Sequence, residues 1–205
     1  MPRVSEEHLE RRRQQILDAA QLCFARKGFH ETSMQDVFAE SGLSAGAVYR
    51  YFKSKNDLVA ALAGQTSVQL RSVIAATVRA DPLPPPAELV HTIALEVMRR
   101  TGPDGLARLA PQAWALALVN EDAAVAVRAA MGGIRELWFE YAERMHRAGW
   151  LAPGTDLDAV AKTLFAMLPG FVLEHLILGD VDAGTLARGV EALMPMAAPL
   201  PSGRE

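Results

Sequence analysis

The segment from residue 28 to residue 58 constrains this chain most, because signals for helix ends and helix starts follow one another every few residues. Gly28 can supply the left-handed conformation that closes a helix. Thr32, with Gln35 three residues later, forms a capping-box pattern at the start of the next helix. Ser41-Gly42 ends that helix after about two turns. These signals predict two short helices joined by a tight turn.

The second short helix begins after Ser44 and carries small side chains where a structural helix would carry apolar bulk. Its first residues are Ala45, Gly46 and Ala47. Small residues let a helix approach another surface closely, and a short helix held by a tight turn is typical of proteins that read the major groove of DNA. An ordinary helical hairpin would use similar caps but would not need this small-residue surface. We therefore expect a helix-turn-helix that binds DNA.

These residues resemble the DNA-binding domain of the TetR (tetracycline repressor) family of bacterial transcription regulators. The resemblance spans residues 12–58, roughly a quarter of the chain. It is carried by Ile16-Leu17-x-Ala19-Ala20, Phe24-x-x-x-Gly28-Phe29, Thr32-Ser33-Met34, Gly42-Leu43-Ser44-x-Gly46-x-Val48-Tyr49-x-Tyr51-Phe52 and Lys55-x-x-Leu58. One departure is Phe38, at a position where the family commonly has a small alanine. It predicts altered packing beneath the first of the two short helices.

The resemblance implies that the second short helix lies in the major groove. We expect the methyl groups of Ala45 and Ala47 to contact thymine methyl groups, with Gly46 allowing close approach. Tyr49 is expected to reach a phosphate or a base edge, and Tyr51 a phosphate. Together these five residues form the centre of the expected DNA face.

Other residues complete the expected DNA face. Gln35 can bind an adenine through two hydrogen bonds, although the capping box requires the same amide. Phosphate contacts are expected from Ser33, Ser44 and Lys55, helped by the free N–H groups at the start of the helix that follows residue 54. Two apolar side chains are expected to pack inward, Val48 and Phe52.

The distribution of charge agrees with a DNA partner although the net charge of the whole chain is −3. Residues 1–60 carry nine Lys or Arg and eight Asp or Glu, whereas the remainder carries 12 and 16. Arg11, Arg12, Arg13, Lys53 and Lys55 are all near the expected DNA face. Binding should therefore depend on salt, with modest affinity for non-specific DNA.

Composition excludes several other classes of protein. The hydrophobic share of 50% excludes a disordered chain, and the first residues lack the apolar core of a signal peptide. A continuous apolar run of about 18 residues is missing, so we expect a soluble, cytoplasmic protein without a membrane partner. The single cysteine, Cys23, follows the apolar pattern of the first helix, which favours a packed thiol over a redox sensor.

Apolar residues recur at helical spacing beyond residue 57, and strand-like alternation is not found, so we expect an all-α protein of about ten helices. Ser54 as N-cap and Asp57 in the first turn mark the start of the fourth helix. Helices are expected over residues 5–27, 55–80, 87–100, 104–110, 111–120, 121–148, 155–178 and 183–194. The expected domains are a helix-turn-helix DNA-binding domain (1–56), a helical effector-binding and dimerisation domain (57–194) and a disordered tail (195–205).

Two of these helices, 121–148 and 155–178, carry long apolar stripes. Both stripes can face the protein's own core. The family resemblance implies instead that such helices pair with a second copy of the chain in a four-helix bundle. A short recognition helix contacts few base pairs, so two half-sites would also multiply affinity and specificity. The candidate dimer residues are Tyr141, Met145, Leu164, Leu168 and Phe171.

The region from residue 87 to residue 141 is where the resemblance implies a small-molecule effector site. Its apolar and soft side chains point to a hydrophobic or aromatic effector, although aromatic residues at helical spacing are more often core. The candidate residues are His91, Met98, Trp114, Leu118, Met131 and Trp138.

The combined interpretation is a homodimeric repressor that a small hydrophobic effector releases from an inverted-repeat operator in double-stranded DNA. An alternative is a DNA-binding regulator that answers to a protein partner or activates transcription. A purely structural bundle would not need the small-residue surface. An enzyme is not expected, because zinc-ligand spacing, a nucleophile elbow and a phosphate-binding glycine loop are all missing from the sequence, and neither a metal nor a cofactor is predicted.

Overall fold

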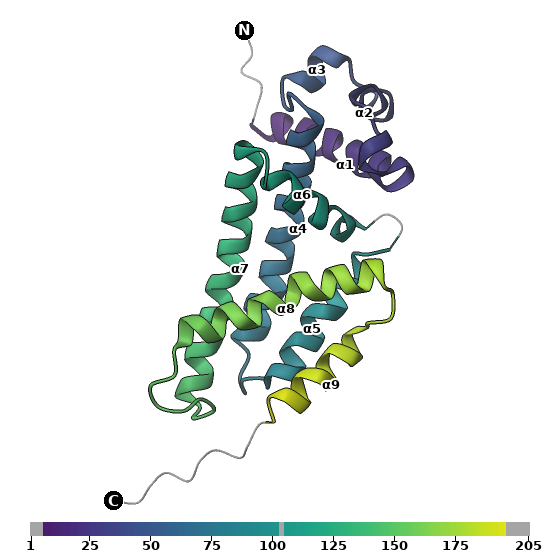
Figure 1. The fold of residues 1–205 in the computed structure, drawn as a ribbon. Helices are drawn as coiled ribbons and strands as arrows, with labels where there is room; N and C mark the ends of the chain where they lie inside the picture. Colours follow the sequence, from purple (N-terminus) through teal and green to yellow (C-terminus); the bar gives the residue numbers. More distant parts are fainter. Residues whose placement is uncertain (1–5, 103–104, 196–205) are drawn as a thin grey trace, which may run out of the picture. The chain divides into compact units, whose positions relative to one another are not determined.

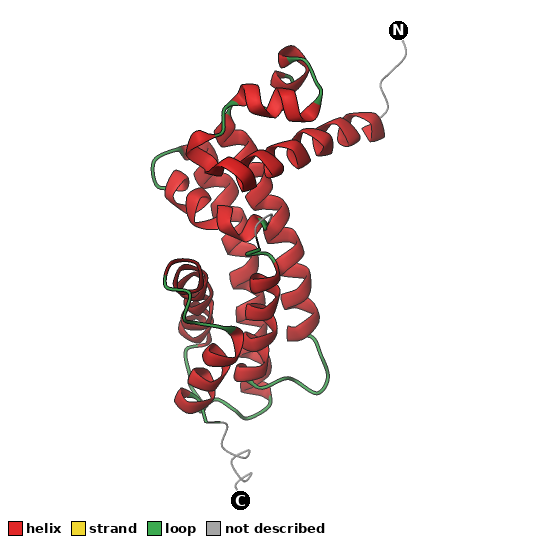
Figure 2. Cartoon of the chain, turned by 90° about the vertical axis from the view of Figure 1, so that its right-hand side faces the viewer, coloured by secondary structure: helices red, strands yellow, loops and turns green. Residues whose placement is uncertain are grey.

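The computed structural model describes residues 6–102 and 105–195, and every regular element within them is helical (Figures 1 and 2). The α-helices are α1 (Glu6–Glu31), α2 (Met34–Ser41), α3 (Ala45–Tyr49), α4 (Lys55–Val78), α5 (Pro86–Arg99), α6 (Ala110–Ala117), α7 (Glu121–Arg147), α8 (Leu157–Ile177) and α9 (Ala183–Leu193), with a 3-10 helix η1 (Leu106–Leu109) before α6. The expected all-α fold is confirmed. From residue 196 on, the predicted tail lies outside the described residues.

The chain forms two compact units, and each is built from two separate segments. We call them the N-terminal unit, Met1–Thr66 with Arg100–Arg128, and the C-terminal unit, Ser67–Arg99 with Ala129–Glu205. Helices α4 and α7 each begin in the N-terminal unit and end in the C-terminal unit. The domain boundary predicted after residue 56 falls inside the first turn of α4.

The core of the N-terminal unit forms because α1 places apolar side chains at three- and four-residue spacing on one face. Ile16, Leu17, Ala20 and Phe24 on that face are buried, and α2 packs against α1. From the segments that follow, the core receives Val37, Val48, Phe52 and Leu58. The inward packing predicted for Val48 and Phe52 is therefore confirmed. Each such side chain contributes about 1.5–3 kcal/mol when removed from water.

The C-terminal unit is organised by the packing of α9 along α5 (Figure 1). Its largest fully buried side chains come from α7 and α8 and include Trp138, Tyr141 and Phe171. The Tyr141 hydroxyl donates to the carbonyl oxygen of Pro84 at 2.7 Å, and burial raises the pKa of this phenol. Arg79, just after α4, forms two parallel hydrogen bonds of 2.9 Å with Glu140 of α7.

Helix α8 is long and apolar enough, by length and composition alone, to cross a membrane. Core helices of soluble proteins pass the same test. Here Ala161, Leu164, Phe171 and Val172 are buried in the C-terminal unit, whereas the other residues of α8 are half-buried or exposed.

Candidate nucleic-acid interface

The link between α1 and α2 is closed by Thr32, which corrects one prediction. Gly28 adopts φ 77°, as expected for a residue that interrupts the helix. Thr32 is only 1% exposed, and its hydroxyl lies 3.1 Å from the carbonyl oxygen of Cys23 and 2.7 Å from that of Gly28. Its side chain therefore points back to α1, so the prediction that Thr32 caps α2 was wrong.

The N-cap of α2 is Ser33, one residue later than predicted. Its hydroxyl accepts from the Asp36 N–H at 3.2 Å, and the Asp36 carboxylate accepts from the Ser33 N–H at 2.8 Å. Lys27 lies 2.6 Å from the same carboxylate, and Lys27 together with Ser33 holds the pKa of Asp36 well below its usual range. The shift of the capping box leaves the exposed amide of Gln35 free of a capping role.

The turn and α3 have the capping geometry that the sequence predicted. Gly42 ends α2 with φ 66° in the left-handed region. Ser44 caps α3 by accepting from the Ala47 N–H at 3.3 Å. Ala45 and Gly46 are exposed, and a Cβ atom added to Gly46 would meet no heavy atom within 4 Å. The start of α3 is therefore an open surface of small residues.

Tyr49 at the end of α3 is 46% exposed and rests against Phe38 of α2. The two ring centroids lie 5.3 Å apart, with the rings inclined at 70°. Phe38, for which the sequence predicted altered packing beneath α2, makes this edge-on contact with α3, and the contact orients the phenol of Tyr49. Tyr51 is half-buried in the turn that follows α3.

Lys55, which the sequence assigned to a phosphate, has its ammonium group engaged inside the protein. Nζ donates to the carbonyl oxygens of Phe29 at 2.7 Å, His30 at 3.2 Å and Thr32 at 2.9 Å. It also lies 4.4 Å from the centroid of the Phe29 ring. The expected capping of α4 is present, because Ser54 Oγ accepts from the Asp57 N–H at 3.2 Å.

The basic side chains around α3 and α1 differ in their exposure and in their contacts with other protein groups. Arg50 and Lys53 are exposed directly after α3. Sequence reasoning did not single out Arg50, although a cation next to the expected recognition helix was a usable signal. Arg12 donates to Gln15 at 2.8 Å, and Arg13 lies 5.6 Å from the centroid of the Phe52 ring. Arg12 and Arg13 thus have partners within the N-terminal unit.

Residues 16–62, which contain all of α2 and α3, match the model of the family described as bacterial regulatory proteins, tetR family. Residues 16–62 are therefore similar to the DNA-binding segment of the tetR family. The match begins in α1 and ends in α4, so it covers the capped turn, the open surface of α3 and Lys55.

Several curated proteins are similar to the chain over the same region. An uncharacterised HTH-type transcriptional regulator, YfiR, of Bacillus subtilis is 49% identical over 57 residues, 28% of each chain. HTH-type transcriptional repressor Rv1474c of Mycobacterium tuberculosis is 40% identical over 73 residues, 36% of this chain and 39% of the relative. HTH-type transcriptional repressor AcnR of Corynebacterium diphtheriae is 36% identical over 75 residues, 37% and 40% of the two chains. The chain thus spans two fifths or less of these curated relatives.

Solved structures share the fold of the whole chain. Salmonella enterica GusR has a TM-score of 0.68 at 22% identity, with 95% of this chain and 100% of that chain covered. SmeT, the repressor of the Stenotrophomonas maltophilia multidrug efflux pump SmeDEF, has a TM-score of 0.68 at 22% identity, covering 91% and 93%. At this identity the likeness establishes the fold and nothing finer.

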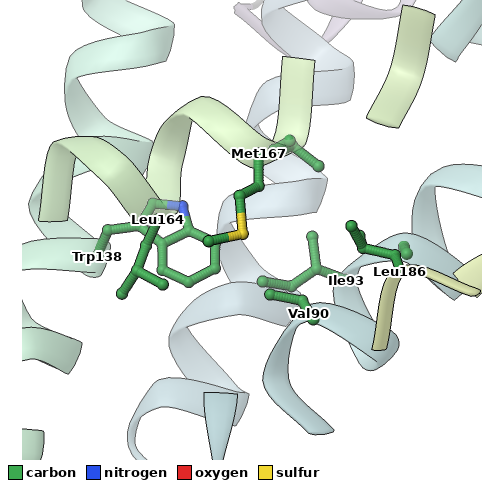
Figure 3. A pocket seen from close by; sticks show the side chains of 8 residues that line it. Val90, Ile93, Trp138, Leu164, Met167 and Leu186 are labelled. Carbon is green, nitrogen blue, oxygen red and sulfur yellow. The ribbon is translucent and has the colours of Figure 1, made fainter. Parts of the chain in front are cut away.

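A small apolar cavity lies inside the C-terminal unit (Figure 3). Its volume is about 10 Å³, room for about one water molecule. It is lined by Val90, Ile93, Ala94, Trp138, Leu164, Met167, Leu168 and Leu186. The thioether of Met167 points toward the indole of Trp138 (Figure 3).

Of the six residues predicted for the effector site, Trp138 lines this cavity. His91, Met98 and Met131 are half-buried in other parts of α5 and α7. Trp114 belongs to α6 of the N-terminal unit, and Leu118 is 86% exposed. Sequence reasoning missed the contributions of α8 and α9, although the apolar face of α5 at Val90 and Ile93 was visible as a periodic pattern.

The residues predicted for a dimer interface lie mostly in the core of the single chain. Tyr141, Met145, Leu164 and Phe171 are buried, and Leu168 is half-buried. These side chains face their own unit, which was the alternative left open for both stripes. The exposed face of α8 carries a different row at three- and four-residue spacing, namely Ala159, Thr163, Ala166, Gly170, Leu173 and Ile177.

Proposed function

We propose that this protein is a DNA-binding transcription regulator that acts as a cytoplasmic homodimeric repressor and recognises an inverted-repeat operator. The observation that carries the proposal is the open surface of α3. Ala45 and Gly46 stand exposed at the start of α3, and Phe38 orients Tyr49 at its end. This surface lies within the residues that match the tetR family, whose repressors Rv1474c and AcnR are similar over the same segment.

The variant Gly46→Leu tests this assignment of α3. No heavy atom lies within 4 Å of the position of a new Cβ, and the backbone of Gly46 is helical, so the protein should fold normally. In the major groove, however, the added side chain would prevent close approach. We expect operator binding to fall at least tenfold in a fluorescence-anisotropy titration, with an unchanged circular dichroism spectrum.

An exposed alanine on α4 provides the matched control. Ala76→Leu adds the same bulk to a helix outside the helix-turn-helix and should bind the operator like the wild type. Equal affinity of Gly46→Leu and wild type for the operator would remove α3 from its assigned role.

The proposed dimer is supported by the row of exposed residues on α8, from Ala159 to Ile177. Small residues there, including Ala166 and Gly170, allow two helices to pack closely, and Leu173 and Ile177 add exposed apolar area. A five-residue recognition helix also contacts few base pairs, so a second copy would supply the second half-site.

The proposed effector is a small hydrophobic molecule bound by the C-terminal unit. Support comes from the wholly apolar lining of the cavity beside Trp138 and from Met167, whose flexible side chain can move to enlarge it. Such an effector acts by binding the DNA-free conformation more tightly, and a tenfold release requires about 1.4 kcal/mol of difference.

Binding of apolar aromatic compounds tests the effector proposal. We expect one or more members of a panel of substituted benzenes and naphthalenes to raise the melting temperature of the wild type. Met167→Trp should abolish the increase, because the larger side chain fills the cavity. Ala76→Trp, at an exposed position of α4 away from the cavity, should retain it. A thermal increase that Met167→Trp leaves unchanged would place the ligand elsewhere.

A second candidate function is a DNA-binding regulator without a small-molecule effector, controlled by a protein partner or acting as an activator. The small size of the cavity favours it, since about 10 Å³ holds no organic molecule without rearrangement. An organic extract of the purified protein distinguishes the two, because a bound hydrophobic molecule supports the effector.

A further inference from the structure

The ammonium group of Lys55 has all of its hydrogen-bond donors satisfied by main-chain carbonyl groups. A lysine ammonium carries three N–H donors. In this structure Nζ has three carbonyl partners, Phe29, His30 and Thr32, at 2.7, 3.2 and 2.9 Å. The face of the Phe29 ring, with its centroid 4.4 Å away, adds a fourth favourable contact.

These carbonyl groups need a donor because of how α1 ends. The φ of 77° at Gly28 interrupts the helix, so the carbonyl groups after it leave the regular helical pattern. The single O–H of Thr32 lies within hydrogen-bond distance of the carbonyl oxygens of Cys23 and Gly28, and Lys55 donates to the carbonyl groups that follow in the link. A cation is also the favoured partner for carbonyl groups at a helix C-terminus.

We propose that Lys55 is a positioning residue that fixes the start of α4 to the link between α1 and α2, and that it is not a phosphate contact. The proposal rests on the DNA-binding function proposed above. Lys55 acts through the geometry of the α2–α3 pair, because the chain enters α2 directly after the link that it holds. The Lys55 ammonium could bind a phosphate only if three carbonyl groups lost their hydrogen-bond donor.

The neighbouring Lys53 is the residue suited to a phosphate. It is exposed, and it precedes the N-terminus of α4 by two residues. Its main-chain N–H donates to the Asp57 carboxylate at 2.8 Å. This hydrogen bond holds the backbone of Lys53 in place, so its exposed side chain extends from an ordered position. Lys53 and Lys55 therefore make a matched pair with opposite expected roles.

Competitive acetylation of lysines tests the proposal on the unmodified protein. The chain has four lysines, Lys27, Lys53, Lys55 and Lys162, and mass spectrometry can follow each. The protein is labelled with trace acetic anhydride, free and bound to a 30-base-pair genomic fragment that it retains. We expect Lys55 to react at least tenfold more slowly than Lys53 in the free protein, with no further change on DNA. Lys53 should become protected only on DNA.

The two possible failures are distinguishable in this experiment. Rapid labelling of Lys55 in the free protein, followed by protection on DNA, would overturn its positioning role. Absence of any DNA-dependent protection of Lys53 would instead count against the proposed DNA face, while the rate for Lys55 in the free protein still tests the carbonyl contacts.

Salt dependence separates positioning from phosphate contact. Log affinity falls with log salt concentration in proportion to the number of phosphates neutralised, so removal of one contact lowers the slope by about one. We expect Lys53→Met to lower the slope in this way. Lys55→Met should weaken binding at least tenfold at every salt concentration and leave the slope unchanged.

Lys55→Arg is the second variant, in case Lys55→Met folds poorly. Arginine contacts phosphates at least as well as lysine, but its planar guanidinium cannot reproduce a compact ammonium among three carbonyl groups. We expect Lys55→Arg to lose affinity with the wild-type salt slope. Wild-type affinity in Lys55→Arg, or a reduced slope in Lys55→Met, would overturn the proposal.

Discussion

At the residue scale, the presentation of Tyr49 depends on a side chain that never needs to touch DNA. Tyr49 is the large exposed side chain of α3, and Phe38 meets its ring edge-on at 5.3 Å. An alanine at position 38 would leave that ring without its neighbour. Phe38 therefore restricts the orientations open to the phenol, which would lower the entropy lost in the proposed contact of Tyr49 with a phosphate or base edge.

The double-mutant cycle of Phe38→Ala and Tyr49→Ala measures this dependence. We expect Tyr49→Ala to lower operator affinity by about 1–3 kcal/mol. Phe38→Ala should lower it by about 0.5–1.5 kcal/mol, the usual contribution of an aromatic pair. Because Phe38 acts through Tyr49, the effect of Phe38→Ala should vanish in the Tyr49→Ala background. Fully additive losses in anisotropy titrations would show that Phe38 acts independently.

Residue identities near α3 could be predicted from the sequence, but their partners could not. Thr32 and Ser33 are both good N-cap residues, and only the buried contact of Thr32 with the end of α1 decides between them. In the same way, the sequence alone favours a phosphate contact for Lys55, and only the distances from its ammonium to three carbonyl oxygens reveal its partners. Thr32 contacts carbonyl groups on the preceding helix, and Lys55 contacts carbonyl groups more than 20 residues earlier in the chain, so local capping signals reveal neither.

At the element scale, the start of α2 is held by a charge-dependent cap. The Asp36 carboxylate accepts from the Ser33 N–H and from Lys27, and both contacts favour its ionised form. A lowered pKa in the folded protein means that the contribution to stability is complete above the unfolded pKa of about 4. It is lost as the pH falls below that value toward the folded pKa.

The variant Asp36→Asn should show this dependence on pH. We expect it to unfold at lower urea concentration than the wild type at pH 6, because the amide has no charge to pair with Lys27. The difference should shrink at pH 3, where unfolded Asp36 is protonated. Urea titrations followed by circular dichroism measure both midpoints. A difference of the same size at the two pH values would contradict the assigned role of the carboxylate.

Element bounds were predicted well because local signals determine them. The expected helix 121–148 is found at Glu121–Arg147, and 155–178 at Leu157–Ile177. The lining of the cavity was predicted poorly for a physical reason. Periodicity shows which face of a helix turns inward, but it does not show which other helix that face meets, so the contribution of Leu186 from α9 was missed.

At the scale of the whole molecule, two helices belong to both units. Within the N-terminal unit, Lys55 fastens the beginning of α4, and Gln65 donates to Gln14 of α1 at 2.6 Å. Within the C-terminal unit, Arg79 just after α4 pairs with Glu140, and Arg144 donates to the carbonyl oxygen of Val78. Each end of α4 is thus tied to the unit in which it lies.

The variant Ala166→Glu tests the proposed dimer. Ala166 is exposed in the single chain, so a carboxylate there should not disturb the fold, but it would bury charge in an interface along α8. We expect the variant to elute as a monomer in size-exclusion chromatography with light scattering and to bind the operator at least tenfold more weakly.

Ala76→Glu on α4 is the control and should behave as the wild type. Two results would remove α8 from the interface: a dimeric Ala166→Glu protein, or a wild type that is monomeric at micromolar concentration.

Recognition of DNA through α3 is tested most directly by selecting sheared genomic DNA with the purified protein at about 0.15 M salt and sequencing the bound fragments. A parallel selection uses Gly46→Leu, whose fold should be intact. We expect enrichment of one or a few inverted repeats with half-sites about one helical turn apart, and loss of that enrichment in the variant. The same fragments recovered by both proteins, or no enrichment by the wild type at this or lower salt, would contradict recognition of DNA through α3.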